Sequence, residues 1–482
     1  MRMMLLASAA AIAVTGCNSE PPELDAEDSA ALSENGVDDA SMKESGEDAA
    51  ASADPDMADT DSAMGMDADA DPMDGADMDD GMESGMAQSA ETLTTAPVVN
   101  VSDTSPEETG APNVDYVEPA FDGQTRAPKP AVTHAWTIEP VTDGLDSPWG
   151  FEFLPSGAML VTEKAGTMHV VQPDGTVSAP IGGVPEVDNR DQGGLLDVAL
   201  SPDFANDRMV YLTYSEPRGN GENGTAVARG RFEGGRLNDV EVIFQQDPAW
   251  ASTMHYGSRI VFAPDGTLFI GLGERSDDPP RDRAQNPDDH IGTVVRINPD
   301  GSIPEDNPFA DGEGGAPEVW AYGIRNIQAA ALNPSTEALW TIEHGPRGGD
   351  ELNIPEAGKN YGWPTITYGQ NYDGSTMGEG IAQQEGMEQP VYYWDPVIAP
   401  SGMTFYDGEV FPEWRGDIFV GGLASMQVVR LVLDGDRVAA EEWLEAPSRV
   451  RDVKTGPDGA IYLALEAADN QIVRIVPDQS GQ

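Results

Sequence analysis

The sequence predicts an all-β fold, a six-bladed β-propeller, preceded by a signal peptide and a long disordered acidic tether. Three observations lead to this prediction. From about residue 133 to residue 480, apolar and polar residues alternate with a period of two in short segments, and turns rich in Pro, Asp and Gly separate these segments. One strand–turn–strand unit recurs six times over the same range. Residues 1–132 show neither feature.

Residues 1–16 have the pattern of an export signal. A basic start precedes an apolar run of about a dozen residues, which is too short to span a bilayer. The run ends in VTGC at Cys17, which resembles a bacterial lipobox, in which the cysteine carries a lipid. Cys17 is the only cysteine of the chain, whereas structural cysteines of exported proteins normally come in pairs. We therefore expect an exported, periplasm-facing protein that reaches a membrane only through a lipid anchor. Asn18 favours the outer membrane, and an ordinary signal peptide with a chance cysteine is the alternative.

Residues 17–132 are expected to be a disordered acidic linker rich in Met, Asp and Ala. Lys43 is the only basic residue between positions 18 and 110. Low hydrophobicity with charges of one sign cannot offset the entropy lost on ordering. The whole chain of 482 residues has a formal net charge of -59, from 85 acidic and 26 basic residues. Such a charge repels nucleic acid, so we exclude that class of partner.

The propeller prediction rests on six copies of one hairpin. Each copy has an alternating strand, a tight turn and a second strand rich in Val, Leu, Ile and aromatic residues. No convincing amphipathic helix lies between them, which favours sheets alone. A two-sheet sandwich is the structural alternative, but it does not explain sixfold repetition. The copies span residues 150–163, 196–214, 258–274, 327–345, 402–422 and 452–466.

Equivalent positions of repeated blades must lie at the same end of a propeller. Counted back from the turn proline, Gln192, His255 and Arg325 occupy nearly the same position in three different copies. Arg449 and Arg451 occupy a similar position in the last copy. Convergent polar groups over an apolar, Gly-rich core are typical of a binding site. The arginines call for an anionic ligand, because the guanidinium fork fits carboxylates.

The third hairpin predicts a paired imidazole and carboxylate. A loop over residues 263–266 would pair Phe262 with Thr267 and would place His255 opposite Glu274. Directly opposite residues lie ~4.5–5.5 Å apart at Cβ, so the carboxylate could hold the ring and raise its basicity. A surface His beside a surface Glu is the alternative for this hairpin taken alone.

At this point residues 136–477 resemble the soluble sugar dehydrogenases that use pyrroloquinoline quinone (PQQ), the aldose sugar or glucose–sorbosone dehydrogenase family. The order and spacing of the motifs match as well as their residues. The motifs are Asp191-QGGLLDVALSPDF, His255-YGSRIVFAPDGTLFIGLG, Gly323-IRN, Glu343-HGPRGGDELN, Lys359-NYGWP and Arg449-VRDV.

The resemblance implies an enzyme that oxidises the C1 hydroxyl of aldoses to lactones with PQQ and Ca²⁺. His255 would be the catalytic base, with Arg325 at the reactive quinone oxygen and Asn326 beside it. The remaining cofactor contacts implied are Gln192, Arg449 and Arg451. Carbonyl groups of Gly345 and Pro346 would bind the calcium that bridges the cofactor, and Glu351 and Tyr361 would belong to a second, structural calcium region. The role of Glu274 as a carboxylate that supports the base is predicted from the hairpin register and is not implied by the resemblance.

Two positions depart from the best-known glucose oxidisers of the family. Ala424 stands where they have a lysine near the quinone, and Met254 stands where they have an aspartate before the histidine. Ala424 removes a cationic contact, which would weaken cofactor binding. Met254 changes the neighbour of the catalytic histidine, which would change the sugar that is bound. A chain with one cysteine cannot form the C-x-x-C-H haem motif, so we expect a separate electron acceptor, a cytochrome or a quinone. A non-catalytic propeller that binds carbohydrate or protein is the alternative function, and a calcium-dependent lactonase is a poorer match.

Overall fold

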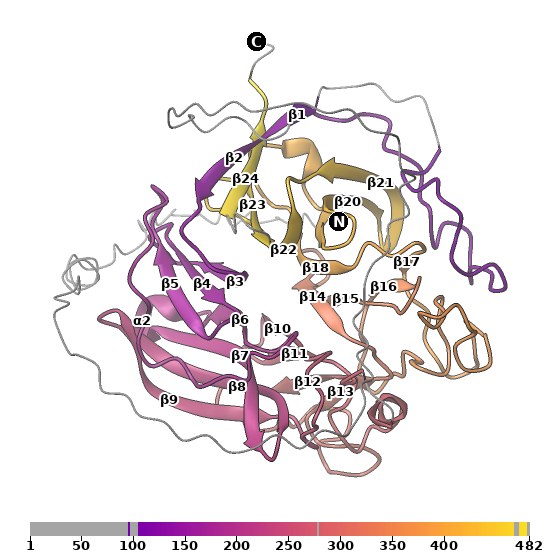
Figure 1. Cartoon of the computed structure of the whole chain (residues 1–482), viewed down its shortest axis with the longest axis horizontal. Coiled ribbons are helices and arrows are strands. Elements are labelled where there is room, and N and C mark those ends of the chain that lie inside the picture. The colour runs from indigo at the N-terminus through magenta and orange to yellow at the C-terminus, as the bar shows by residue number, and fades with distance from the viewer. Residues whose placement is uncertain (1–94, 97–104, 277–278, 467–471, 480–482) are drawn as a thin grey trace, which may run out of the picture. The chain divides into compact units, whose positions relative to one another are not determined.

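The computed structural model describes residues 95–96, 105–276, 279–466 and 472–479. The predicted signal peptide and most of the predicted linker, residues 17–94 and 97–104, lie outside these residues. Six sheets of antiparallel strands make up the described part, which confirms the all-β class and the six-bladed propeller (Figure 1). No helix in that part is long and apolar enough to cross a bilayer.

Each sheet is one blade. The first blade has strands β3 (Pro148–Phe153), β4 (Met159–Glu163) and β5 (Thr167–Val171). The second has β6 (Leu195–Leu200), β7 (Met209–Gly219), β8 (Glu222–Glu233) and β9 (Arg236–Gln245). The third has β10 (Gly257–Phe262), β11 (Leu268–Leu272), β12 (Thr293–Ile297) and β13 (Val319–Tyr322). The fourth has β14 (Ile327–Leu332), β15 (Leu339–Glu343), β16 (Asp350–Asn353) and β17 (Tyr392–Trp394). The fifth has β18 (Pro400–Phe405), β19 (Ile418–Gly422), β20 (Gln427–Asp434) and β21 (Arg437–Glu445).

The sixth blade joins both ends of the propeller sequence. It has β22 (Arg449–Thr455), β23 (Ile461–Glu466) and β24 (Ile472–Pro477), and the early strand β2 (Trp136–Thr142) pairs with β24. A two-residue strand, β1 (Thr95–Ala96), adds to β2. The helices described are short: α2 (Phe204–Asp207), η1 (Pro280–Gln285) and η2 (Pro412–Trp414).

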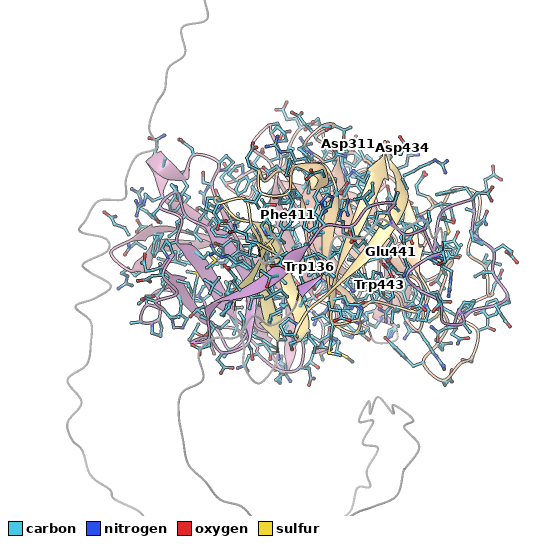
Figure 2. All side chains as sticks on the ribbon, turned by 90° about the horizontal axis from the view of Figure 1, so that it is seen from above. Trp136, Asp311, Phe411, Asp434, Glu441 and Trp443 are labelled. Carbon is cyan, nitrogen blue, oxygen red and sulfur yellow. The ribbon has the colours of Figure 1, made fainter. Side chains whose placement is uncertain are left out.

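The core is divided among the joints between blades. The innermost strands touch in the cyclic order β3, β6, β10, β14, β18, β22 and back to β3. Between each two neighbouring blades lies one of the six main clusters of buried apolar side chains. In the joint between the fifth and sixth blades, for example, Trp136 of β2 packs in the same cluster as Phe411 (Figure 2). Apolar alternation therefore stabilises the ring by joining its sheets face to face.

The predicted linker boundary at residue 132 is wrong for its last part. Residues 105–132, here called the clasp, are described and pack against the fourth and fifth blades. Gln124 is fully buried, and Val114 and Ala127 are buried as well. Tyr393 donates its backbone N–H to the Gln124 carbonyl at 2.9 Å, and Glu441 donates its backbone N–H to the Pro128 carbonyl at 3.0 Å. Composition suggested disorder because the clasp has no core of its own, whereas the blades supply its partners.

Candidate active site

His255 and Glu274 meet at the end of the hairpin formed by β10 and β11. Nδ1 of His255 lies 2.6 Å from Oε2 of Glu274, and the two side chains are only 7% and 1% exposed. The predicted contact is therefore present, but the predicted register is wrong. Phe262 pairs with Leu268, one residue later than expected, because Ala263 and Thr267 close a three-residue turn. A bulge between Gly257 and Ile260 then removes the one-residue difference before the strand reaches His255.

The electrostatics of this pair keep the imidazole neutral. Burial lowers the pKa of His255 and outweighs the nearby charge of Glu274, which alone would raise it; the charge of Arg325 lowers it further. The expected gain in basicity is thus reversed. Burial alone would raise the pKa of Glu274, but the close contact with His255 and the charge of Arg325 hold it below its usual range. Glu274 is therefore an ionised carboxylate that accepts a hydrogen bond from the Nδ1–H group of His255. The other ring nitrogen, Nε2, is left to accept a proton from a substrate hydroxyl.

The backbone around the pair is fixed by Arg275, a residue that the sequence analysis missed. Arg275 is fully buried, and its guanidinium lies 4.0 Å from the ring centre of Tyr256. It donates hydrogen bonds to the carbonyl groups of Met254 and Ser252 at 3.0 and 2.7 Å. His255 itself has a left-handed backbone, with φ of 50°. This conformation is costly for a residue other than glycine, so the surrounding contacts must hold it in place.

Three of the predicted cofactor residues, Gln192, Arg325 and Asn326, share one hydrogen-bonded network with the backbone around His255 and Glu274. Gln192 Oε1 accepts the backbone N–H of His255 at 2.9 Å. Asn326 Oδ1 accepts the backbone N–H of Gly257 at 3.0 Å, and the Arg325 carbonyl accepts the backbone N–H of Glu274 at 2.9 Å. The structure thus brings together residues from the second, third and fourth blades, as the repeat positions predict.

Arg449 and Arg451 converge on Glu466, which the sequence analysis did not single out. Arg449 Nε and Arg451 Nη2 lie 3.2 and 2.5 Å from its carboxylate oxygens. Arg449 is 44% exposed, whereas Arg451 is largely buried and also donates to Gln328 Oε1 at 3.3 Å. Arg449 Nη1 donates to the carbonyl of Leu423 at 3.2 Å, next to Ala424.

Glu466 belongs to a set of glutamates that recur at the same position in several blades. A glutamate stands at or just beyond the end of the second strand in four blades: Glu163, Glu274, Glu343 and Glu466. Each accepts a hydrogen bond from a group at the start of a blade's first strand or just before it. Alignment of the repeats by their second strands would have revealed these carboxylates.

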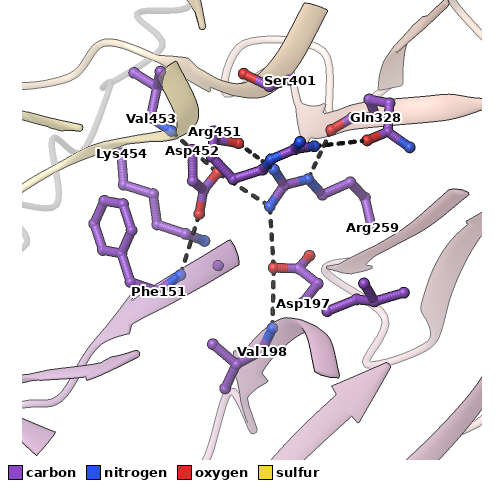
Figure 3. A network of polar contacts seen from close by, with 12 residues as sticks. Phe151, Asp197, Val198, Arg259, Gln328, Ser401, Arg451, Asp452, Val453 and Lys454 are labelled. Atoms are coloured by element: carbon purple, nitrogen blue, oxygen red, sulfur yellow. Dashed lines mark hydrogen bonds and ion pairs between the residues drawn. The ribbon is translucent and has the colours of Figure 1, made fainter. Parts of the chain in front are cut away.

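Arg259 is the centre of a network of polar contacts that joins several blades (Figure 3). This arginine of the third blade lies 3.2 Å from Asp197 Oδ1 in the second and 3.1 Å from Asp452 Oδ1 in the sixth. Its Nη2 donates to the Arg451 carbonyl at 3.0 Å, and its Nε donates to the Gln328 carbonyl at 2.7 Å. The third and sixth blades are opposite each other, so these bonds cross the centre of the ring. All the charged side chains in this group are buried and have partners, as buried charges require.

Arg325 contacts the loop predicted to bind the cofactor's calcium. Its Nη1 donates to the Gly345 carbonyl at 2.7 Å, and its guanidinium lies 5.2 Å from the ring centre of Trp363. Among the described residues, Arg325 Nε has no hydrogen-bond partner although it is buried. A buried N–H without a partner is costly, and an oxygen of a bound quinone or carboxylate would satisfy it. The residues therefore fit an anionic, oxygen-rich cofactor such as PQQ.

The predicted second calcium region is a buried acidic site. Burial raises the pKa of Glu343 to about 7 and holds that of Glu351 well above its usual range. The charge of Glu343 raises the pKa of Glu351 further, whereas Arg325 partly offsets the effect of burial on Glu343. Both accept from Asn353 Nδ2, and a cavity of about 10 Å³ lined by Glu343, Glu351 and Tyr361 lies next to them. Asn353 Oδ1 has no hydrogen-bond partner within the described residues. Oxygen donors around a space for one ion fit calcium.

The possible calcium ligands are side-chain and carbonyl oxygens of the fourth blade and the loops that follow its strands. Across the described residues, no group of three or more His, Cys, Asp or Glu side chains is arranged to hold a metal ion. The calcium predicted at Gly345 and Pro346 relies on their carbonyl oxygens. The Tyr361 hydroxyl donates to the Ile354 carbonyl at 2.5 Å and accepts the Glu356 N–H at 3.0 Å, so one lone pair of its oxygen is left for the predicted ion.

The chain is similar to known proteins over most of the propeller. The model of the Glucose / Sorbosone dehydrogenase family matches residues 145–474. The aldose sugar dehydrogenase YliI of Escherichia coli (strain K12) is 43% identical over 346 residues, which cover 70% of this chain and 92% of that protein. A crystal structure of a glucose dehydrogenase, 46% identical, superposes with a TM-score of 0.68 and covers 70% of this chain and 98% of that one. The PQQ-bound aldose sugar dehydrogenase from Streptomyces coelicolor is 28% identical, with a TM-score of 0.59, and covers 71% and 98%.

Proposed function

Because this chain belongs to the glucose/sorbosone dehydrogenase family, a family of oxidoreductases, we propose that it oxidises aldose sugars at C1 with bound PQQ and Ca²⁺. One observation carries the proposal. A buried, neutral histidine paired with a carboxylate lies in the same hydrogen-bonded network as Arg325, Asn326 and Gln192. A non-catalytic sugar-binding propeller would need neither the buried His255–Glu274 pair nor the unpaired N–H of Arg325.

In the proposed reaction, the sugar gives up a proton and a hydride to two different acceptors. His255 accepts the proton of the C1 hydroxyl at Nε2, while Nδ1 donates to Glu274 and the carboxylate stabilises the imidazolium that forms. The C1–H bond breaks as the carbonyl forms, so the sugar loses one proton and one hydride and becomes a lactone. The chemistry that PQQ and calcium would supply when bound is a hydride acceptor and a Lewis acid that polarises it. Arg325 offers its guanidinium to the developing negative charge.

The cofactor would be held by the residues of several blades together. Gln192 and Asn326 offer amide groups, and Arg449 and Arg451 face carboxylates of the cofactor. Gly345 and Pro346 would supply carbonyl oxygens to the bridging calcium, and the Glu343–Glu351 site would bind the second ion. The electrons would leave to a separate cytochrome or quinone. Export to the periplasmic side with a lipid on Cys17 remains part of the proposal.

The test is reconstitution. The full chain, purified without cofactor, is mixed with PQQ and Ca²⁺ and screened against aldoses and polyols with an artificial acceptor dye. We expect dye reduction that requires PQQ, Ca²⁺ and an aldose together, with lactone as the product. PQQ binding without oxidation of any sugar would instead support a different substrate class. Absence of PQQ binding would refute the cofactor assignment.

A further inference from the structure

The clasp lies outside residues 145–474, which match the family model, yet it contacts loops next to the proposed site. Asn113 makes the direct contacts to these loops. The carboxylate of Asp395, at the end of the fourth blade, is buried and accepts three hydrogen bonds from the clasp. The Asn113 backbone N–H and side-chain Nδ2 bind its Oδ1 at 2.9 and 2.7 Å, and the Val114 N–H binds its Oδ2 at 2.9 Å. A buried carboxylate needs such donors, so the clasp and Asp395 are fixed together.

The same clasp residue reaches the loop of residues 344–349. Arg347 Nε donates to Asn113 Oδ1 at 3.1 Å. Asp395 packs against Gly348 so closely that a Cβ added at Gly348 would lie 2.8 Å from the carboxylate. On its other side, this loop is held by Arg325, through the Gly345 carbonyl, and by Asp350, which accepts the Gly345 N–H at 2.8 Å. The loop therefore lies between the proposed catalytic residues and the clasp.

A second route joins the clasp to this loop. The Tyr368 hydroxyl lies 3.0 Å from Oε1 of the fully buried Gln124 and 2.7 Å from Oε1 of Gln389, and its one proton is shared between these two acceptors. Two residues along the chain, Gln370 and Arg347 exchange two backbone hydrogen bonds, both 3.0 Å long. The clasp thus holds the loop directly through Asn113 and indirectly through Tyr368.

We propose that the clasp is part of the active-site apparatus, with Asn113 as a positioning residue that fixes the loop of residues 344–349 through Arg347 and Asp395. This proposal rests on the proposed function, because Gly345 and Pro346 of the loop are the carbonyl groups assigned to the cofactor's calcium. The clasp does not touch the substrate. It sets the loop that presents those carbonyl groups to the cofactor, and a chain without it would hold them less firmly.

The test compares two full-length variants. Asn113→Ala removes both side-chain contacts, to Asp395 and from Arg347. Lys129→Ala is the matched control, because Lys129 lies in the same clasp and pairs at 2.8 Å with Glu107, which is also in the clasp. Hydrogen exchange of the cofactor-free proteins is followed in peptides covering residues 344–349, with strand β7 of the second blade as the internal reference. PQQ affinity is then titrated at saturating Ca²⁺.

We expect exchange several-fold faster in residues 344–349 of Asn113→Ala, and PQQ affinity about tenfold weaker, as the loss of charge-assisted hydrogen bonds implies. Exchange in β7 should not change, and Lys129→Ala should match the wild type. Arg347→Ala, an exposed change that leaves the clasp on Asp395, should loosen the loop to a smaller degree.

Three results would overturn the proposal. They are unchanged exchange of the loop, faster exchange spread over all blades with a lower melting temperature, and a looser loop with wild-type PQQ affinity. If the wild type itself binds no PQQ, the proposed function fails. In that case the exchange comparison still decides whether the clasp holds the loop, and the proposed role toward the cofactor falls with the function.

Discussion

Replacement of Glu274 by glutamine tests the proposed base through its partner. The change keeps the size of the side chain and an oxygen that can accept from Nδ1 of His255, but it removes the negative charge 2.6 Å from the ring. The imidazolium formed during proton transfer then lacks its counter-charge in a buried site. His255→Gln is the companion variant, because it removes the base and leaves Gln192, Arg325 and the Arg449–Arg451 pair to bind the cofactor.

The expected sizes differ between the two variants. A positioned general base contributes ~10²–10⁴-fold in rate, so His255→Gln should lose about that much turnover. A charge-assisted hydrogen bond is about twice as strong as a neutral one of ~1 kcal/mol, so Glu274→Gln should lose only about five- to tenfold. The pKa of His255 is already lowered by burial, and loss of the carboxylate lowers it further. Since the base works only when deprotonated, the acidic limb of the pH–rate profile should move to lower pH.

The assay is dye-linked turnover between pH 4 and pH 9, with PQQ occupancy measured by titration in each variant. Both variants should bind PQQ as the wild type does. Wild-type turnover in His255→Gln with normal occupancy would place the base elsewhere. An acidic limb that stays in place or moves to higher pH in Glu274→Gln would show that the carboxylate does not act on the imidazole.

Three further outcomes are expected. Arg449→Ala and Arg451→Ala should each weaken PQQ binding roughly ten- to a hundredfold, through loss of a charged contact of ~1.5–3 kcal/mol, and calorimetry showing wild-type affinity in both would remove them from the site. Cys17→Ser should release the protein from membranes with its activity intact. Failure of the wild type to incorporate labelled lipid would show that the anchor assignment is wrong. Calcium should raise the melting temperature more at pH 8 than at pH 5, because Glu351 and Glu343, whose pKa values burial raises, must lose their protons to bind it; an equal rise in Glu351→Gln would contradict this.

The blades could be predicted from sequence because each one repeats the same local pattern. Alternation and a Pro/Asp/Gly turn determine a hairpin within about twenty residues, and six copies determine the ring. The clasp could not be predicted in this way. Val114, Gln124 and Ala127 are buried against residues far along the chain, so their own neighbours give no periodic signal. Composition describes what a segment can bury by itself, and it fails where another part of the protein supplies the core.

In the site, position along the repeat was more informative than fine register. Counting from the turn proline correctly brought Gln192, His255 and Arg325 to one network. The register between His255 and Glu274 was wrong near the turn, and a bulge hid the error, since bulges depend on backbone conformations such as φ of 99° at Ser258. The sign of the His255 pKa shift could not be predicted either, because it depends on burial.

The contacts of Arg259 with Asp452 and Arg451 cross the centre of the ring between opposite blades. On the proposed function, we expect the cofactor and the sugar to use the same opening, because Arg259, Asp197 and Asp452 are buried together at the centre of the ring. What enters first then leaves last. PQQ must be loaded before the sugar, and the lactone must depart before the cofactor can. A saturating sugar would therefore slow the escape of PQQ on dilution, and the enzyme would hold its cofactor best while it is working.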